Sequence, residues 1–146
     1  MRQLKNIVLL LGVFGFGSVA HAACTGGKTL FSCTTTNNKY VELCDNGATL
    51  QYSFGKVGQT PELALSVPRT RASTYQWQGI GRWINYSVRI PNGNTFYEVF
   101  DSVDRIEQTA EAGIYVEASG KNVATINCQI DTLVSNLDGV KLRPTE

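Results

Sequence analysis

The sequence predicts an all-β fold, a seven- to eight-stranded antiparallel barrel or sandwich stapled by disulfides. Apolar and polar residues alternate over short runs, which is the period of a half-buried strand. Gly, Asn, Asp and Pro separate these runs at short spacing, as they do in hairpins. Hydrophobic residues make up 42% of the 146 residues and charged residues 17%, which suffices for the core of one domain and excludes a disordered chain.

The expected strands follow one another in chain order with short connections. They span residues 29–35, 39–45, 49–54, 62–67, 83–90, 95–102, 113–119 and 122–130. Residues 55–59 are expected to form a loop, and residues 131–137 one helical turn before the tail. Acidic residues recur every three or four positions across residues 101–112, which favours a short helix or an exposed connection there.

The central hairpin carries the sharpest turn signal. Pro91-Asn92-Gly93-Asn94 contains Asn-Gly, the strongest two-residue hairpin signal. Centring the turn there pairs Val88 with Tyr97 and Tyr86 with Val99. One face of the hairpin is then apolar and is the predicted core face: Ile84, Tyr86, Val88, Ile90, Tyr97 and Val99. The other face is mixed and carries Trp83, Asn85, Ser87, Arg89, Phe96, Glu98 and Phe100.

A second hairpin is expected nearer the C-terminus. A Gly120-Lys121 turn joins its strands and pairs Val116 with Thr125 and Tyr115 with Ile126. A glycine in such a turn has a purely structural explanation, since it adopts positive φ without steric cost.

The first 22 residues have the features of a secretory signal. Arg2 and Lys5 precede an apolar run over residues 7–16, and Ala20-His21-Ala22 matches an A-x-A cleavage site. We therefore expect a signal peptide at 1–22 and a single exported β domain at 23–146, periplasmic or secreted. The apolar run is too short to span a bilayer, so no membrane span is expected.

Cleavage would leave a domain without histidine and with a small net charge. His21 is the only histidine, so the domain could not build a Ser-His-Asp triad, a Cys-His pair or an imidazole zinc site. Loss of the two basic residues Arg2 and Lys5 changes the formal net charge from +1 to −1, which lacks the basic excess that nucleic acid requires. We expect no enzyme activity, no cofactor and no metal.

The four cysteines remain in the exported domain and predict two disulfides. They are Cys24, Cys33, Cys44 and Cys128. A hairpin turn centred between Asn38 and Lys39 places Cys33 opposite Cys44, which leaves Cys24 to pair with Cys128. A turn centred on Asn37-Asn38 places Glu42 opposite Cys33 instead, so this pairing depends on a one-residue register. A zinc site of four thiolates is disfavoured, because no C-x-x-C is present and export favours oxidation.

An aromatic and basic stretch is a candidate interaction surface. It contains Tyr75, Trp77, Arg82 and Trp83, with Arg69 and Arg71 just upstream. Exposed aromatic residues beside arginines are typical of binding hot spots. The competing interpretation is that the tryptophans fill the open end of a barrel, since Trp is highly buried on average. Gly79-Ile80-Gly81 lacks the third glycine of a dinucleotide motif and indicates a bend.

Two short segments resemble one family of exported β-barrels. Phe31-Ser32-Cys33 and Asn127-Cys128-Gln129 are similar to the opening and closing strands of bacterial lysozyme inhibitors of the membrane-bound and periplasmic type. The resemblance implies a barrel that inserts a Ser-Gly loop into the lysozyme cleft. Ser119-Gly120-Lys121 matches that loop in its first two residues, and Lys121 would approach the carboxylates of the enzyme. Where the family has a tyrosine shortly after Ser-Gly, this chain has Asn122-Val123.

Two functions follow, and in both the partner is another protein. The first is inhibition of a lysozyme or another cell-wall hydrolase by loop insertion. The second is an immunity-type or envelope-assembly binding module that uses the aromatic and arginine surface. Because lysozymes are strongly basic, the first needs a local acidic patch, with Asp101, Asp104, Glu107 and Glu111 as candidates. Asp101 and Asp104 could instead form the carboxylate pair of a glycosidase, although solvated loop acids explain them better.

Overall fold

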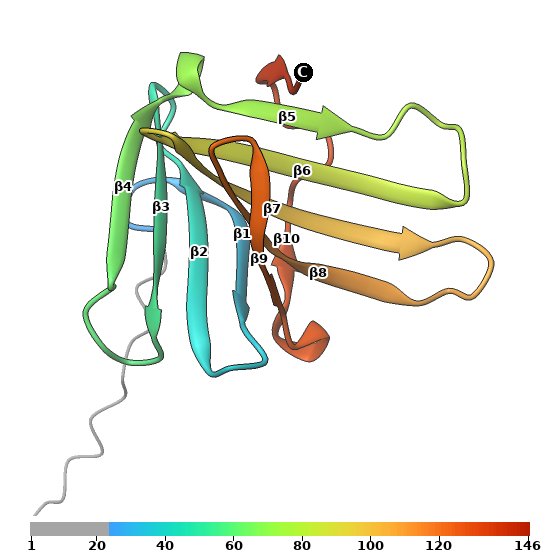
Figure 1. The fold of residues 1–146 in the computed structure, drawn as a ribbon, viewed down its shortest axis with the longest axis horizontal. Coiled ribbons are helices and arrows are strands. Elements are labelled where there is room, and N and C mark those ends of the chain that lie inside the picture. The colour runs from blue at the N-terminus through green and yellow to red at the C-terminus, as the bar shows by residue number, and fades with distance from the viewer. Residues whose placement is uncertain (1–23) are drawn as a thin grey trace, which may run out of the picture.

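The computed structural model describes residues 24–146, which form two β-sheets packed face to face (Figure 1). The strand order is β10-β1-β2-β3-β4 in the first sheet and β11-β5-β6-β7-β8-β9 in the second. The predicted all-β class is therefore confirmed, in the form of two separate sheets and not a closed barrel. The predicted signal peptide at 1–22 lies outside the described residues. Within those residues, none of the helical turns has the length or apolar character needed to cross a bilayer.

The eight longest strands correspond to the eight predicted ones. The first sheet contains β1 (Lys28–Thr34), β2 (Lys39–Asp45), β3 (Thr49–Lys56), β4 (Leu63–Pro68) and β10 (Val134–Ser135). The second contains β5 (Ser73–Gln76), β6 (Trp83–Asn92), β7 (Thr95–Asp104), β8 (Ala110–Ala118), β9 (Lys121–Asn127) and β11 (Arg143–Pro144). A 3-10 turn, η1 (Arg69–Arg71), leads from β4 in one sheet to β5 in the other. All strand pairs are antiparallel except β11 with β5.

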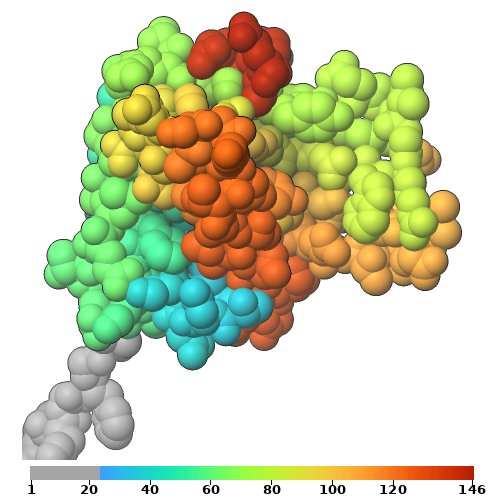
Figure 2. Space-filling view, in the orientation of Figure 1, coloured from blue at the N-terminus to red at the C-terminus, as the bar shows by residue number. Residues whose placement is uncertain are grey.

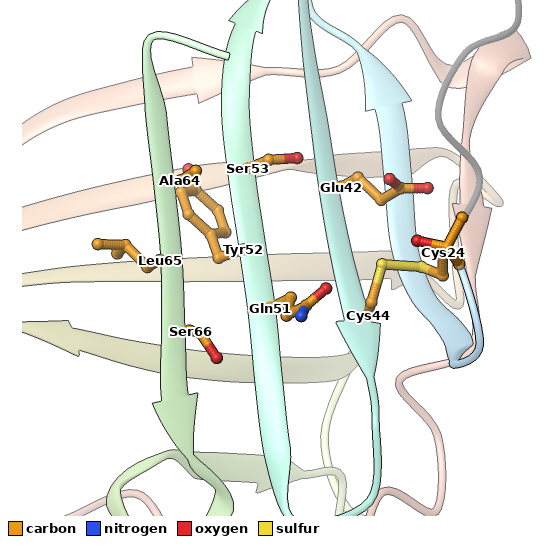
Figure 3. Close-up of a pocket in the computed structure, with 10 residues that line it drawn as sticks. Cys24, Glu42, Cys44, Gln51, Tyr52, Ser53, Ala64, Leu65 and Ser66 are labelled. Atoms are coloured by element: carbon orange, nitrogen blue, oxygen red, sulfur yellow. A yellow bond between two sulfur atoms is a disulfide. The ribbon is translucent and has the colours of Figure 1, made fainter. Parts of the chain in front are cut away.

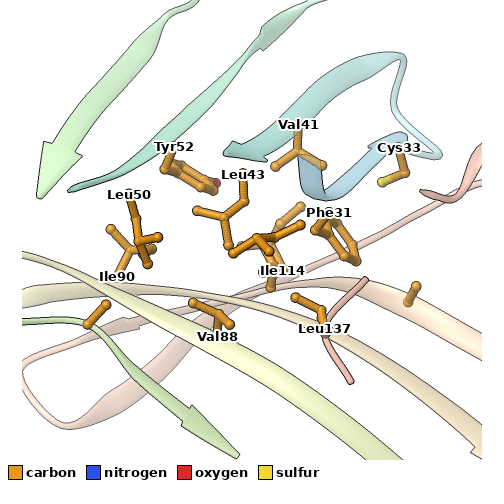
Figure 4. Close-up of a cluster of buried hydrophobic side chains, with 14 of the residues drawn as sticks. Phe31, Cys33, Val41, Leu43, Leu50, Tyr52, Val88, Ile90, Ile114 and Leu137 are labelled. Atoms are coloured by element: carbon orange, nitrogen blue, oxygen red, sulfur yellow. The ribbon is translucent and has the colours of Figure 1, made fainter. Parts of the chain in front are cut away.

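The core lies between the two sheets (Figure 4). Where the two sheets overlap, alternate residues of the strands point into it, as the alternation predicts. The fully buried side chains include Phe31, Val41, Leu43 and Leu50 from the first sheet and Val88, Ile90, Val99 and Ile114 from the second. Tyr52 and Tyr97 stack across the interface with ring centroids 5.3 Å apart. Each buried aliphatic side chain contributes about 1.5–3 kcal/mol to the free energy of folding, so this interface is the main source of stability.

The β6–β7 hairpin confirms the predicted core face but not the predicted register. Val88 pairs with Val99 and Ile90 with Tyr97, two positions away from the expected pairing. The turn is formed by Gly93 and Asn94, and only Gly93 has positive φ, which is the geometry of a type II′ turn with glycine in its first central position. A shift of two residues keeps each side chain on its face, so the face prediction survives the register error.

The β8–β9 hairpin differs from expectation in the opposite direction, because it turns one residue earlier than expected. Ser119 and Gly120 both have positive φ, as a type I′ turn requires, so the predicted Gly120-Lys121 turn is wrong. Tyr115 therefore pairs with Thr125, and Ile126 pairs with Ile114 and packs against the core. The one-residue shift leaves Tyr115 on the outer face of the sheet.

The disulfides are Cys24–Cys44 and Cys33–Cys128, so the expected pairing of Cys33 with Cys44 and of Cys24 with Cys128 is wrong. The turn after β1 closes with the Thr35 N–H donating to the Lys39 carbonyl at 2.7 Å, and this places Cys33 opposite Val41. Cys33 then points into the core together with Phe31, whereas Cys44 points out of the sheet. Two cysteines on opposite faces cannot be bridged.

Two of the expected connections also differ. Residues 101–112 form no helix, because β7 continues to Asp104 and β8 begins at Ala110. An exposed connection is present, but it is confined to residues 105–109. The acids at this end belong to a hairpin whose turn Asp104 organises. The helical turn expected over 131–137 is a 3-10 turn, η2 (Ile130–Thr132), followed by β10.

Candidate functional site

The second sheet extends beyond the first at one end of the molecule (Figure 1). We call this region the overhang and define it as residues 77–85 and 102–111, which include the β5–β6 loop and the β7–β8 turn. In the space-filling view it forms a lobe at the right-hand side (Figure 2). The core stops short of it, since neither Ile84 nor Val103 belongs to the core cluster of the described chain. Other interactions must therefore hold the overhang in shape.

Asp104 is the centre of those interactions. Its residue is only 1% exposed, and its carboxylate accepts hydrogen bonds from Arg82 Nε at 2.9 and 2.8 Å. The backbone N–H groups of Ile106 and Glu107 donate to the same carboxylate at 2.9 and 3.2 Å. The hydrogen bond from Arg82 is the main cause that lowers the pKa of Asp104 to about 2. Asp104 is thus a charged group that joins the β5–β6 loop to the β7–β8 turn.

Arg105 and Trp77 join the same two loops a second time. The Arg105 side chain donates from Nη1 to the Gly81 carbonyl at 3.1 Å, and its guanidinium lies 5.4 Å from the Trp77 ring centroid. The Trp77 indole N–H donates to the Ile80 carbonyl at 2.9 Å. Gly79 and Gly81 have positive φ, which confirms the bend predicted for this segment. The loops are therefore cross-linked by side chains and are not free to splay.

Apolar side chains protrude from this fixed framework. Ile80 is 84% exposed, Ile106 is 69% exposed, and Val103 and Trp83 are 39% and 38% exposed. All four lie in the overhang: Ile80 and Ile106 on its loops, Trp83 on its outer face and Val103 on its inner face. Exposed apolar groups on a monomer surface are typical of protein interaction sites.

A trough of about 590 Å³ lies on the outer face of the second sheet, where the overhang meets the rest of the sandwich. Its floor is low because the strand register puts small residues in the middle: Tyr75 lies opposite Ser87, and Ser87 lies opposite Phe100. Phe100 in turn lies opposite Gly113, which has no side chain. Tyr115, two residues further along β8, stacks on Phe100 with ring centroids 4.2 Å apart. Such stacking contributes about 0.5–1.5 kcal/mol and fixes the ring.

Acidic side chains stand on both sides of this floor. Glu98 lies directly opposite Tyr115, and Glu111 lies opposite Ser102. Glu98 accepts a hydrogen bond from the Ser87 hydroxyl at 2.6 Å. Burial raises the pKa of the Tyr115 hydroxyl, and the negative charges of Glu111 and Glu98 raise it further. No lysine or arginine is among the described residues that line the trough.

Beside the trough, on the same outer face of the second sheet, lies an arginine, Arg89. Arg89 pairs with Glu117 at 2.6 Å and stacks over the Phe96 ring at 4.0 Å from its centroid. A smaller hollow of about 230 Å³ surrounds this group and shares Glu98 and Tyr115 with the trough. The sheet thus carries two neighbouring sets of rings and carboxylates. In the first set Arg89 pairs with the carboxylate of Glu117, whereas the guanidinium nearest the second set, that of Arg82 at 5.7 Å from the Trp83 ring centroid, pairs with Asp104 outside the trough.

The predicted aromatic and arginine surface is brought together only in part. Tyr75, which is 45% exposed, and Trp83 both line the trough. Arg82 is engaged by Asp104, and Trp77 is folded against Arg105. Neither tryptophan belongs to the core cluster of the described chain, so they do not plug a barrel. Arg69 and Arg71 lie apart, in η1, where Arg69 pairs with Asp45.

Sequence reasoning missed Glu98, Phe100 and Tyr115 as site residues. Glu98 and Phe100 belong to the mixed face of the central hairpin. Their position on the same face as Trp83 is the sequence signal that could have identified them as site residues. Tyr115 was hidden by the one-residue register error, which had paired it with Ile126.

The predicted inhibitor loop lies at the opposite end of the sheet from the overhang. Ser119, Gly120 and Lys121 are all exposed. The Ser119 N–H donates to the Asn94 carbonyl at 3.0 Å, which sets this turn beside the β6–β7 turn. Lys121 has no ion pair within the described chain at the criterion of 4.0 Å between charged atoms.

The predicted acidic patch does not form as expected. Asp101 points to the inner face, accepts a hydrogen bond from Ser135 and has a raised pKa, mainly because of burial. Asp104 points to the outer face and is paired with Arg82. The two carboxylates lie on opposite faces of β7, so they cannot act as the pair of a glycosidase. Only Glu107 and Glu111 remain exposed.

A second hollow, of about 380 Å³, lies on the outer face of the first sheet beside the Cys24–Cys44 disulfide (Figure 3). Glu42 is 7% exposed there. Burial raises the pKa of its carboxyl, and this effect outweighs the hydrogen bonds from the Cys24 backbone and the Tyr40 side chain, which lower the pKa. Potential ligand atoms of Cys24, Glu42 and Cys44 lie within 4.8 Å of one another. Both sulfurs are consumed by the disulfide, which leaves one carboxylate and no metal site.

Comparison of the chain with protein-family models, characterised proteins and solved structures gave no match.

Proposed function

We propose that this protein is an exported binding protein that docks a partner protein on its overhang. The single observation that carries the proposal is the exposure of Ile80 and Ile106, 84% and 69%, on loops held by the Asp104 network. Interface hot spots combine protruding apolar anchors with a preformed backbone. A preformed surface loses little conformational entropy on binding, which favours affinity.

Two further features support binding over catalysis and export over a cytosolic location. Residues 24–146 contain no histidine, and Asp101 and Asp104 stand on opposite faces of β7. The four cysteines form two disulfides, and such pairs persist in oxidising compartments such as the periplasm or the cell exterior.

The test compares three immobilised proteins: the parent, a double variant Ile80→Ser and Ile106→Ser, and a control Val123→Ser. Val123 is 60% exposed but lies on the edge strand β9, outside the overhang. A panel of lysozymes and a periplasmic extract are passed over each. We expect a partner that the parent and the control retain, and that the double variant binds at least about 30-fold more weakly, the loss that removing a hot spot causes. Equal retention by all three proteins would contradict the proposal.

A second candidate function is inhibition of a lysozyme or another cell-wall hydrolase through the Ser119–Gly120–Lys121 turn. The observation that favours it is the position of this turn beside the β6–β7 turn, with Lys121 exposed and outside every ion pair of the described chain. A cation in that position can approach the carboxylates of an enzyme cleft.

A lytic assay separates the two candidates. Lys121→Ala should weaken stoichiometric inhibition of a lysozyme by about tenfold or more, whereas Lys56→Ala, an exposed lysine of β3, should not. If the Ile80→Ser and Ile106→Ser variant loses inhibition and Lys121→Ala keeps it, the overhang and not the turn is the binding site.

A further inference from the structure

The trough on the outer face of the second sheet has the composition of a cation site. Of the aromatic residues that line it, three are exposed and come from three different strands: Tyr75 of β5, Trp83 of β6 and Tyr115 of β8. Each is more than a third exposed. Phe100 covers one face of Tyr115 and the Arg82 guanidinium lies 5.7 Å from the Trp83 ring centroid, so a ligand would contact the ring surface that these groups leave open. The faces of aromatic rings attract positive charge, and Trp and Tyr attract it most strongly.

The carboxylates of the trough lack a positive partner. Glu98 and Glu111 line the same hollow, and among the described residues around it there is no lysine or arginine. Glu146 and Asp101 are further acidic residues of its lining, and the Asp101 carboxylate accepts a hydrogen bond from Ser135. The hydrogen bond from Ser87 to Glu98 does not neutralise the charge. An anionic ligand would be repelled, and a neutral one would leave both charges uncompensated in a partly enclosed site.

The smaller hollow beside the trough shows which chemical group can bind to an aromatic ring and a carboxylate on this face of the sheet. There Arg89 stacks on Phe96 at 4.0 Å and pairs with Glu117 at 2.6 Å. The trough repeats the ring and the carboxylate on the same face, with Glu98 and Tyr115 common to both hollows. A planar guanidinium can stack on a ring and donate to a carboxylate at the same time, which an ammonium group does less well.

We propose that the trough binds a positively charged side chain, an arginine in preference to a lysine, that the partner protein presents. This inference rests on the proposed function, because the trough adjoins the overhang and would be covered by the same partner. The overhang would supply apolar anchoring, and the trough would select partners with a basic side chain next to their apolar contact.

The probe is a tri-arginine peptide with blocked ends, added to the oxidised protein and followed by nuclear magnetic resonance at the Trp83 indole and Tyr115 ring. Tri-lysine, the neutral isostere tri-citrulline and chitotriose are run in parallel. We expect the arginine peptide to shift both signals and to bind at least about tenfold more tightly than the citrulline peptide. Equal binding of citrulline, preferential binding of chitotriose, or no shift with arginine would overturn the proposal.

Variants place the site. Glu98→Gln with Glu111→Gln should weaken binding of the arginine peptide by about tenfold or more. Glu107→Gln removes an exposed acid of the overhang that does not line the trough, and it should leave peptide binding unchanged. Equal weakening by both sets would show a diffuse charge effect and would overturn the proposal.

The outcomes for the two proposals are separable. Loss of the partner from the Ile80→Ser and Ile106→Ser variant, without binding of the arginine peptide, would sustain the proposed function and reject the cation site. If the arginine peptide binds in the trough but the Ile80→Ser and Ile106→Ser variant retains the partner as the parent does, the proposed function is rejected and the cation site is supported.

Discussion

The body of the sandwich and the overhang share the strands β6, β7 and β8, yet different forces hold them. In the body these strands face the first sheet, and Val88, Val99 and Ile114 are completely buried. In the overhang the same strands have no opposing sheet, and Val103 is 39% exposed on the equivalent face. The overhang relies instead on the Arg82–Asp104 pair and on the contacts of Arg105 and Trp77.

The difference teaches where stability and recognition are located. Burial between two sheets removes apolar surface from water over a large area, which polar contacts in a single layer cannot do. A single layer has two accessible faces and can keep apolar side chains exposed, provided that its loops are fixed. We therefore expect changes in the body to alter the free energy of unfolding, and changes in the overhang to alter binding and local motion.

The largest effect is expected from the covalent link inside the body. Cys33–Cys128 closes a loop with a sequence separation of 95, and Cys24–Cys44 closes one of 20. Replacing Cys33 and Cys128 by Ser should cost about 4–5 kcal/mol of unfolding free energy, and replacing Cys24 and Cys44 about 3 kcal/mol. Urea unfolding of both double variants measures the two losses. A larger loss for the shorter loop would show that the chain-entropy argument does not govern here.

The next effect comes from matched truncations in the two regions. Leu43→Ala removes a fully buried side chain and should destabilise the protein by about 2–5 kcal/mol. Ile80→Ala removes a side chain that is 84% exposed and should change the unfolding free energy by no more than about 0.5 kcal/mol. Thermal unfolding of the two variants makes the comparison. A large loss for Ile80→Ala would mean that the overhang packs against something in the body.

A smaller and local effect is expected from Asp104→Asn. The neutral side chain accepts weaker hydrogen bonds from Arg82 and from the N–H groups of Ile106 and Glu107. Amide hydrogen exchange should therefore accelerate at Ile106 and Glu107, while Val88 and Val99 in the body exchange as before. Equal acceleration in both regions would show that the overhang and the body open as one unit.

The smallest effect is a pH dependence of the same contact. The pKa of Asp104 is about 2 in the folded protein against an ordinary value of 3.8, so its charged form stabilises the fold at higher pH. That contribution is fully present above about pH 4 and is lost as the pH falls towards 2. The protection factor of the Ile106 amide, which is its exchange rate relative to an unstructured peptide at the same pH, should fall across this window in the parent, and in Asp104→Asn it should not show that dependence. A carboxyl titration of Asp104 near its ordinary pKa would contradict this assignment.

The sequence predicts much of the body because its signal is local. A period of two places Val88, Ile90 and Val99 on one face whatever the exact pairing, and the structure agrees. The register depends on which turn residues take positive φ. The β6–β7 turn is centred on Gly93-Asn94, one position later than expected, and the β8–β9 turn is centred on Ser119-Gly120, one position earlier. The predicted disulfide pairing is wrong for the same reason, since the β1–β2 turn is shifted from its expected position and places Cys33 and Cys44 on opposite faces of the sheet.

The candidate site was less predictable because its contacts are long-range. Arg82 and Asp104 lie far apart in the sequence, and nothing local distinguishes Asp104 from the solvated acids beside it. The strand β5 was missed because Ser73–Gln76 is short and lacks an apolar alternation. Its Tyr75 reaches the trough only through pairing with Ser87.

The Cys33–Cys128 bridge also determines how the molecule carries a mechanical load. The whole overhang lies between these two cysteines in the sequence. Tension between the N-terminal and C-terminal segments would pass through the sulfur–sulfur bond, so it would not stretch the strands that present the binding surface. Once the bridge is reduced, the same tension would pass along the chain between residues 33 and 128. It would then stretch the strands and loops that hold the partner.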